Sequence, residues 1–244
     1  GGNSAPSAGG MNATETDFQK KKGIKDSIAV MMDDTMKGGG NHNNPDLVRI
    51  LATRSASSVA WLTSIGADIS DIGQMAGATN YRTHRPTGGA AVGAHITKVL
   101  KKNVADRKID VRVNSKVLKL VEDSAGKVIG AVVEGKHSGT YTLLAKAVVM
   151  AAGGFSANQA LVGQYQPQFV GMTTSNQPGA TGDGMEMGEK AGGELRDMRS
   201  IQIHPTVAAG SRILITEAVR GNGAILVNQE GDRFINEITT RDLV

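Results

Sequence analysis

The sequence contains no cysteine, few aromatic residues and no long hydrophobic run. Without cysteine the chain forms no disulfide, no thiolate metal site and no iron–sulfur cluster, and it carries no covalently attached c-type haem. No apolar stretch reaches the roughly 18 residues that a transmembrane helix needs. The 27 basic and 23 acidic residues give a net charge of +4 without a run of five like charges, which argues against a nucleic-acid-binding tail.

Glycine, in contrast, is abundant, at 32 of 244 residues against a usual share of about 7%. A glycine-rich, aromatic-poor chain with ordinary apolar content suits close approaches between backbone segments, which cofactor-binding α/β proteins need. The length corresponds to one large domain or to one and a half small ones. The sequence opens without an initiator methionine and stops directly after a dense polar motif, so we expect both ends to be cuts from a longer protein.

Hydrophobic periodicity predicts helices over residues 17–37, 44–65 and 92–105, and a further helix from Asp183 to about residue 191. The second of these helices begins with a strong capping signal, an asparagine followed by proline and an acidic residue. Five of its side chains are expected to face the core: Leu47, Leu51, Val59, Trp61 and Leu62.

A β region is predicted between these helices. Strand-like segments occur at residues 111–113, 116–122, 128–134 and 141–144. Residues 147–150 form an entirely apolar run followed by small residues, which is typical of a buried parallel strand beside a ligand. After residue 198 the pattern changes to short strands, and we place a domain boundary there.

Two glycine clusters, at residues 9–10 and 179–184, are candidate cofactor loops. Backbone N–H groups in such loops approach a phosphate or a flat ring without a Cβ in the way. Asp183, at a helix start, either caps that helix or binds a hydroxyl group. Ordinary turns explain the clusters about as well, and no GxGxxG motif follows an opening strand.

The connection over residues 67–90 is long and rich in glycine and threonine. Loops of that length inside a compact protein are usually functional. His84 is a candidate ligand contact in this loop, and Met75 is not explained by helix packing.

The C-terminal part gathers polar residues that suit an anionic substrate, namely His204, Thr216, Glu217, Arg220 and Arg241. An arginine binds a carboxylate through two parallel hydrogen bonds, and a histidine binds a second carboxylate or moves a proton. A surface salt-bridge network is the competing interpretation, and for any single residue it is the simpler one.

Seven sequence strings together resemble one protein family. They are GGNSAPSAGGMNA, THRPTGGAAVGAH, AAGGFSAN, PGATGDG, QIHPT, TEAVRGNGA and NEITTRD. In this order and spacing they resemble the middle part of the soluble fumarate reductases, including the flavocytochrome c type, and the resemblance covers essentially the whole chain. The wider group includes succinate dehydrogenase flavoprotein subunits, L-aspartate oxidase and 3-ketosteroid dehydrogenases.

The resemblance implies an α/β fold of two parts. Residues 1–198 are expected to be part of a Rossmann-like FAD-binding domain with an inserted β-hairpin region, its first βαβ unit missing, and residues 199–244 the start of a mobile α+β capping domain. FAD is expected to be non-covalent, because residues 3–10 contain no histidine of the kind that tethers FAD in bifunctional succinate dehydrogenases. A haem is expected only in a part of the parent protein outside this chain.

The resemblance also assigns roles to residues. It implies cofactor contacts from Asn3, Ser4, Gly9, Gly10, Val117 and Asp183, with Val117 meeting the adenosine end through its backbone. It implies substrate contacts from His204, Thr216, Met75 and Leu214, of which the first two hold carboxylates. Arg241 matches the residue regarded as the proton donor, and Glu217 and Arg220 match the relay that resupplies its proton.

The implied reaction is the FAD-dependent reduction of fumarate to succinate, with a hydride from flavin N5 and a proton from Arg241. Arginine is a poor general acid by its reference pKa of about 12 or more. From its chemistry alone, Arg241 would be expected to bind a substrate carboxylate as a clamp and not to donate a proton.

Two alternatives stay open: a reductase of another α,β-unsaturated acid, such as urocanate or an acrylate, and a non-catalytic flavin-binding fragment. The implied partners are a small dicarboxylate and an electron donor, either a haem or flavin domain or a quinol-linked protein. The expected compartment is the periplasm, with the cytoplasm and the cell exterior as alternatives.

Overall fold

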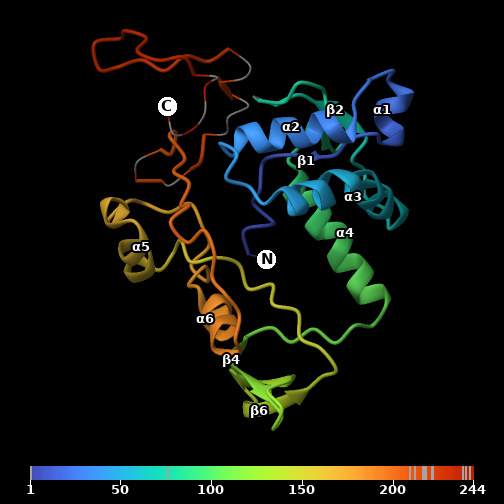
Figure 1. Cartoon of the computed structure of the whole chain (residues 1–244), viewed down its shortest axis with the longest axis vertical. Coiled ribbons are helices and arrows are strands. Elements are labelled where there is room, and N and C mark those ends of the chain that lie inside the picture. The colour runs from blue at the N-terminus through green and yellow to red at the C-terminus, as the bar shows by residue number, and fades with distance from the viewer. Residues whose placement is uncertain are drawn as a thin grey trace. The chain divides into compact units, whose positions relative to one another are not determined.

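The computed structural model describes residues 2–75, 77–208, 210–211, 213–215, 219–220, 223–237, 239, 241 and 243–244. The chain divides into two compact units, one of residues 3–107 with 202–244 and the other of residues 108–201 (Figure 1). The predicted domain boundary between residues 198 and 199 is based on the change of sequence pattern after residue 198 and on the family resemblance, and it stays a prediction. No helix within the described ranges is long and apolar enough to cross a bilayer.

The first unit combines helices with a small sheet. Its elements are β1 (Met11–Asn12), α1 (Asp17–Lys21), α2 (Ile28–Gly38), α3 (Pro45–Ser64), β2 (Asp71–Gly73), β3 (Thr83–Arg85) and α4 (Val92–Asp106). The three strands form an antiparallel sheet in the order β1-β3-β2. The core contains buried residues from α3, from the start of α4 and from the loops that follow β1 and α3, which are Ala13, Val59, Leu62, Ala67, Ile69 and Val92.

The single helix predicted over residues 17–37 is wrong, because α1 and α2 are separate. Gly23 adopts a φ of +67° between them, a left-handed conformation that glycine reaches without a Cβ clash. Ser27 then caps α2, and its hydroxyl accepts a hydrogen bond from the N–H of Val30. The apolar period runs on across this break, so periodicity alone does not reveal it.

α3 begins and ends where the sequence predicts, but its buried face is different. Val59 and Leu62 are buried as expected, whereas Leu47, Leu51 and Trp61 are all more than half exposed. Apolar side chains occur on both faces of this helix, so hydrophobicity did not distinguish them. In the first half of the helix, the buried positions follow the predicted ones by one residue, so that Val48 and Ala52 are buried in place of Leu47 and Leu51. The whole core face consists of Val48, Ala52, Ser55, Val59 and Leu62.

The second unit contains the predicted β-hairpin region. Its elements are β4 (Ser115–Glu122), β5 (Val128–Gly135), β6 (Gly139–Leu144), α5 (Gln159–Tyr165), a 3-10 turn (Pro167–Phe169) and α6 (Asp183–Lys190). The strands form an antiparallel sheet in the order β4-β5-β6. α4 and α6 confirm the helices predicted over 92–105 and from Asp183, whereas residues 111–113 are outside any strand.

The buried parallel strand predicted over residues 147–150 is not formed. Among the described residues no strand pairs with this segment, and Val149 is 89% exposed. A parallel strand needs hydrogen-bonded neighbours at its edges and cover on both faces. The apolar composition therefore indicates that the segment suits a strand covered on both faces, but the described residues provide neither neighbouring strands nor that cover.

Candidate functional site

Residues 2–10 form a turn-rich loop that carries four of the predicted cofactor contacts. The loop crosses the start of α4, where helical N–H groups lack intrahelical acceptors. The N–H of Gly93 donates to the carbonyl of Ser7 at 3.1 Å, and the N–H of Val92 donates to the carbonyl of Gly9 at 3.3 Å. Asn3 and Ser4 are exposed in this loop.

The two glycines of this loop that are predicted to contact the cofactor, Gly9 and Gly10, have different surroundings. A Cβ on Gly10 would lie 2.4 Å from Cγ2 of Thr83 and 2.9 Å from the carbonyl oxygen of His84, so packing against β3 already requires glycine there. A Cβ on Gly9 would meet no atom within 4 Å. Of these two glycines, Gly9 therefore borders open space of the kind that a flat ring needs, and the flavin contacts of the loop stay predictions.

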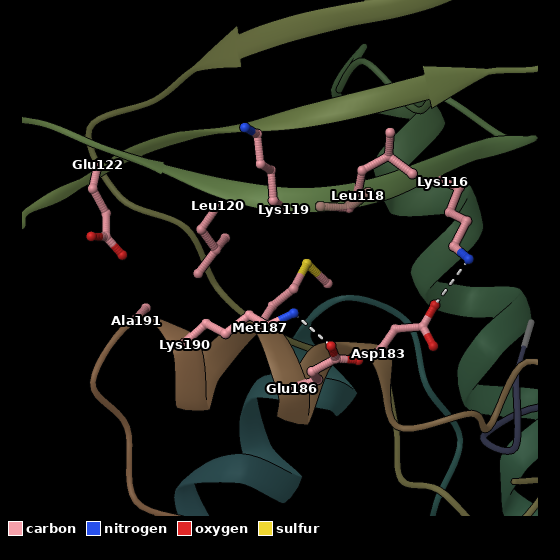
Figure 2. A pocket seen from close by; sticks show the side chains of 11 residues that line it. Lys116, Leu118, Lys119, Leu120, Glu122, Asp183, Glu186, Met187, Lys190 and Ala191 are labelled. Atoms are coloured by element: carbon pink, nitrogen blue, oxygen red, sulfur yellow. Dashed lines mark hydrogen bonds and ion pairs between the residues drawn. The ribbon is translucent and has the colours of Figure 1, made fainter.

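Val117 and Asp183, distant in sequence, line one hollow of about 470 Å³ in the second unit (Figure 2). The hollow lies between β4 and α6. In Figure 2, Leu120 of the strand and Met187 of the helix point into the space between the two elements, and Lys116 reaches Asp183 at one end. The lining combines an apolar interior with charged side chains at the rim, as in many sites for small organic ligands.

β4 is irregular where it borders this hollow. Val117 pairs with Val133 but Lys119 pairs with Val132, so Leu118 is an extra residue and forms a β-bulge. A bulge locally disrupts the hydrogen-bonded ladder and redirects a side chain. A backbone contact from Val117 to a ligand, as the resemblance implies, is compatible with this geometry.

Asp183 opens α6 with an ionised carboxylate. A hydrogen bond that the Thr181 hydroxyl donates to Oδ1 at 2.7 Å lowers the pKa of Asp183, and Lys116 Nζ, 3.4 Å from Oδ2, lowers it further. The Lys116 ion pair is largely exposed and therefore contributes little stability. The carboxylate can accept a hydrogen bond from a ligand hydroxyl, which is one of the two roles expected for Asp183.

His204 is half-buried and is held by its neighbouring backbone. The N–H of Thr206 donates to Nδ1 of His204 at 3.3 Å, so the neutral ring carries its proton on Nε2, the tautomer that donates to a carboxylate. Thr206 is in turn bound to Ile215, whose N–H donates to the Thr206 carbonyl at 2.9 Å. Leu214 lies on this second segment and is 36% exposed. Thr216 and Glu217 follow it and lie outside the described residues.

Arg220 is buried and is oriented by a main-chain acceptor. Its Nη1 donates to the carbonyl oxygen of Glu237 at 3.0 Å, and both residues are less than a tenth exposed. Hydrogen bonds from Arg233 lower the pKa of Glu237 to about 2, and a hydrogen bond from the N–H of Leu226 acts in the same direction. Glu237 is therefore a buried, ionised carboxylate.

Arg241 is half-buried, and its Nη1 donates to Oε1 of Gln202 at 2.7 Å. Gln202 is two residues before His204, so this hydrogen bond connects the segments that carry two of the predicted site residues. A guanidinium in this position suits both a carboxylate clamp and a donor of a proton.

Met75 is half-buried at the start of the predicted functional loop. A buried ion triad holds that loop: Arg82 Nη2 lies 3.0 Å from Asp26 Oδ1 and 2.8 Å from Asp34 Oδ2. The N–H and hydroxyl of Thr79 also donate to Asp34. The loop that carries Met75 is thereby tied to α2.

His84 is an interior structural residue and not a ligand contact of the loop. The side chain is fully buried, its Nε2 lies 2.8 Å from the hydroxyl of Thr16, and its Nδ1 lies 2.9 Å from the carbonyl of Arg82. Burial is the main cause that lowers the pKa of His84. The neutral ring therefore joins α1 to β3.

Sequence reasoning missed Gln202, Arg233 and Glu237. Arg233 and Glu237 are four residues apart, a spacing that indicates an ion pair where the chain turns helically. This spacing was weak evidence for an ion pair, because the sequence around Arg233 and Glu237 predicts no helix or strand and has no apolar periodicity. Gln202 had no signal beyond its place in the string that contains His204.

Comparison with known proteins identifies the family of the chain and several relatives. The model of the FAD binding domain family matches residues 1–244. The chain is 52% identical over 242 residues to the fumarate reductase (cytochrome) of Shewanella frigidimarina, covering 99% of this chain and 42% of that protein. A more distant relative, the urocanate reductase of Eggerthella lenta, is 34% identical over 250 residues, covering 100% of this chain and 41% of that protein.

A solved structure is similar along the same length. The open conformation of a flavocytochrome c3 fumarate reductase superposes with a TM-score of 0.90 at 48% identity, covering 99% of this chain and 43% of that one. The chain thus spans about two fifths of the length of the relatives that it matches.

Proposed function

The chain belongs to the FAD binding domain family, and from this premise we propose that it is the central part of a flavoprotein that reduces fumarate to succinate. The observation that carries the proposal is the 52% identity to a fumarate reductase over 242 residues, a span that includes every predicted site residue. A match of that extent supports the interpretation of the polar C-terminal set as a substrate site over that of a surface salt-bridge network.

Residues in each unit suit a non-covalent FAD. The hollow beside the bulge at Leu118 has an apolar interior and the ionised carboxylate of Asp183 at its rim, which suits a ring and a hydroxyl of the adenosine end. Gly9 borders open space in the N-terminal loop, which suits the flavin ring. When bound, FAD supplies a hydride from N5 of its reduced ring to one carbon of the substrate double bond.

His204 and Thr216 hold the substrate carboxylates in this proposal. Nδ1 of His204 accepts from the N–H of Thr206, so the neutral ring carries its proton on Nε2, the atom that donates to a substrate carboxylate in this proposal. Two carboxylates held by fixed donors polarise the double bond between them and stabilise negative charge that develops at the far carbon. Met75 and Leu214 supply the apolar contacts that exclude water.

Arg241 donates the proton in this proposal, and Arg220 with Glu217 resupplies it. Hydride at one carbon leaves a carbanion at the other, which takes a proton from Arg241 to complete succinate. The carbanion is strongly basic, so even a guanidinium is acidic enough to protonate it. Arg241 returns to its charged form when the relay delivers a proton from solvent.

The remaining proposals concern the surroundings of the chain. Residues 1–198 belong to the FAD-binding domain and residues 199–244 to a capping domain that closes over the substrate. Electrons reach the flavin from a haem domain, a flavin domain or a quinol-linked protein outside this chain, and any haem belongs to that part. We place the protein in the periplasm, as its resemblance to the flavocytochrome branch suggests, with the cytoplasm and the exterior as alternatives.

Reduction of urocanate or of an acrylate is the second candidate, and a 34% identical urocanate reductase supports it. Both reactions use the same hydride and proton chemistry and differ in the groups that hold the substrate. The test is the turnover of the FAD-loaded protein that carries this chain, with a reduced dye as donor, on fumarate and on urocanate. We expect kcat/KM to favour fumarate by about 100-fold or more, because two carboxylate grips are used instead of one. A preference for urocanate would replace the proposed substrate.

A non-catalytic flavin-binding fragment is the third candidate, and it applies to the 244 residues in isolation. The exposed apolar segment at residues 147–150 supports it, because a Rossmann-like sheet needs strands that the described residues lack. Detectable turnover by the isolated 244-residue chain would exclude this candidate.

A further inference from the structure

The irregular segment before Arg241 is organised by one buried carboxylate (residues 223–237 are in the red part of Figure 1). The carboxylate of Glu237 accepts three hydrogen bonds: from Nε and Nη2 of Arg233, at 3.0 and 2.6 Å, and from the N–H of Leu226, at 2.8 Å. Arg233 and Leu226 lie at the base of a hairpin whose arms are joined by the bridge between Val227 and Arg233. Glu237 therefore fixes both arms of this hairpin.

Glu237 also holds Arg220, through its backbone. The Glu237 carbonyl accepts from Nη1 of Arg220 at 3.0 Å, and it lies four residues before Arg241 in the chain. The side chain of Glu237 is only 3% exposed, so its hydrogen bonds compete little with water and hold their geometry. One residue thus holds the proposed relay arginine and lies close in sequence to the proposed proton donor.

We propose that Glu237 is a positioning residue for proton delivery: its side-chain bonds to Arg233 and Leu226 fix the carbonyl that orients Arg220. The inference rests on the proposed function, because Arg220 matters to turnover only if it resupplies the proton of Arg241. Glu237 acts through Arg220 and not on the substrate. Nothing in the resemblance or in the names of the relatives assigns Glu237 a role.

Glu237→Gln tests this arrangement. The amide keeps the shape and an acceptor for the N–H of Leu226, but its NH2 group faces the guanidinium of Arg233. In the FAD-loaded protein that carries this chain, we expect kcat for fumarate to fall about 10- to 100-fold, with KM changed by less than about twofold. The solvent deuterium isotope effect on kcat is expected to rise, because proton delivery slows while substrate binding does not.

Two further variants make the test decisive. Glu230→Gln removes an exposed carboxylate at the tip of the same hairpin and is expected to change neither kcat nor KM. Arg233→Lys keeps the charge but replaces the two-pronged contact by a single donor, so an intermediate loss of kcat with an unchanged KM is expected. If Glu237→Gln does not fold, Arg233→Lys supports or overturns the proposal by the same criterion.

Three results would overturn the inference: a kcat of Glu237→Gln equal to that of the unaltered protein, a rise in KM that matches the fall in kcat, or a loss of turnover that follows a loss of bound FAD. Each of these leaves the proposed function intact. If the unaltered, FAD-loaded protein fails to reduce fumarate, the proposed function itself fails and the inference fails with it.

Discussion

Arg82 and Arg220 are both buried arginines of the first unit, yet they are held in different ways. Arg82 lies between the carboxylates of Asp26 and Asp34, and these ion pairs connect the residue before β3 to α2 and to the loop before it. Arg220 lies in a short stretch, residues 219–220, that is described as helical, and it donates to the main-chain carbonyl of Glu237. The side-chain carboxylate of Glu237, the residue that provides this carbonyl, binds Arg233.

The difference separates two uses of a buried guanidinium. A buried arginine with two acidic partners keeps a loop attached to the fold, and removing it leaves carboxylates buried without compensation. An arginine oriented by a carbonyl, in a segment with the other predicted catalytic residues, is placed for chemistry. We therefore expect changes near Arg82 to reduce stability, and changes near Arg220 and Arg241 to reduce turnover.

The largest effect is expected from Arg241→Ala. Loss of the proposed proton donor should lower kcat for fumarate by about 10³-fold or more, while bound FAD and the melting temperature stay the same. Stopped-flow reduction kinetics and the flavin absorbance measure these quantities. Arg196→Ala is the matched control, because Arg196 is exposed and should leave turnover unchanged. Retention of more than a few per cent of turnover would make Arg241 a clamp and not the donor.

The next effect is expected from Arg82→Met, and it should have the opposite signature. Removing one partner of a buried ion cluster costs about 3–5 kcal/mol of unfolding free energy, whereas kcat per bound FAD should stay the same. Urea unfolding followed by the fluorescence of Trp61 measures the loss. Arg49→Met, in an exposed pair with Asp46, should change stability by less than about 1 kcal/mol. A lower kcat with unchanged stability would reverse the comparison.

The smallest expected effect is the dependence of stability on acidic pH through Glu237. The pKa of Glu237 in the folded chain, about 2, is below the value of about 4.3 expected when the chain is unfolded. Its carboxylate therefore stabilises the fold above about pH 4.3, and that stabilisation is lost as the pH falls toward 2. The melting temperatures of the unaltered protein and of Glu237→Gln should converge over this range. A difference between the two melting temperatures that stays constant down to pH 2 would show that ionisation of Glu237 does not contribute to the stability of the fold.

Local signals predicted much of the fold. Asn44 and the following proline marked the start of α3, and turn residues separated β4 from β5, because capping and turns depend on a few neighbouring residues. The predictions of a buried Trp61 and of a strand at residues 147–150 were wrong for another reason. Which apolar face is covered, and whether a strand finds partners, depends on segments far away in the sequence or outside this chain.

The candidate site was predicted from its residue types and the family resemblance, but its supporting residues were not. Val117 and Asp183 meet in one hollow, although only the resemblance connected them. Glu237 lies in the string NEITTRD, but the resemblance gives it no role, and the role proposed for it follows from three-dimensional contacts to Arg220, Arg233 and Leu226. Residues that position others are defined by such contacts, which a single sequence does not contain.

The most direct test of the account is the visible spectrum of the FAD-loaded protein that carries this chain, recorded without oxygen. The flavin is reduced with a stoichiometric dye, and fumarate is then added. The account predicts that the bleached flavin band returns at once, with one succinate formed for each flavin. A flavin that stays bleached with fumarate, or a purified protein with no flavin band, would contradict it.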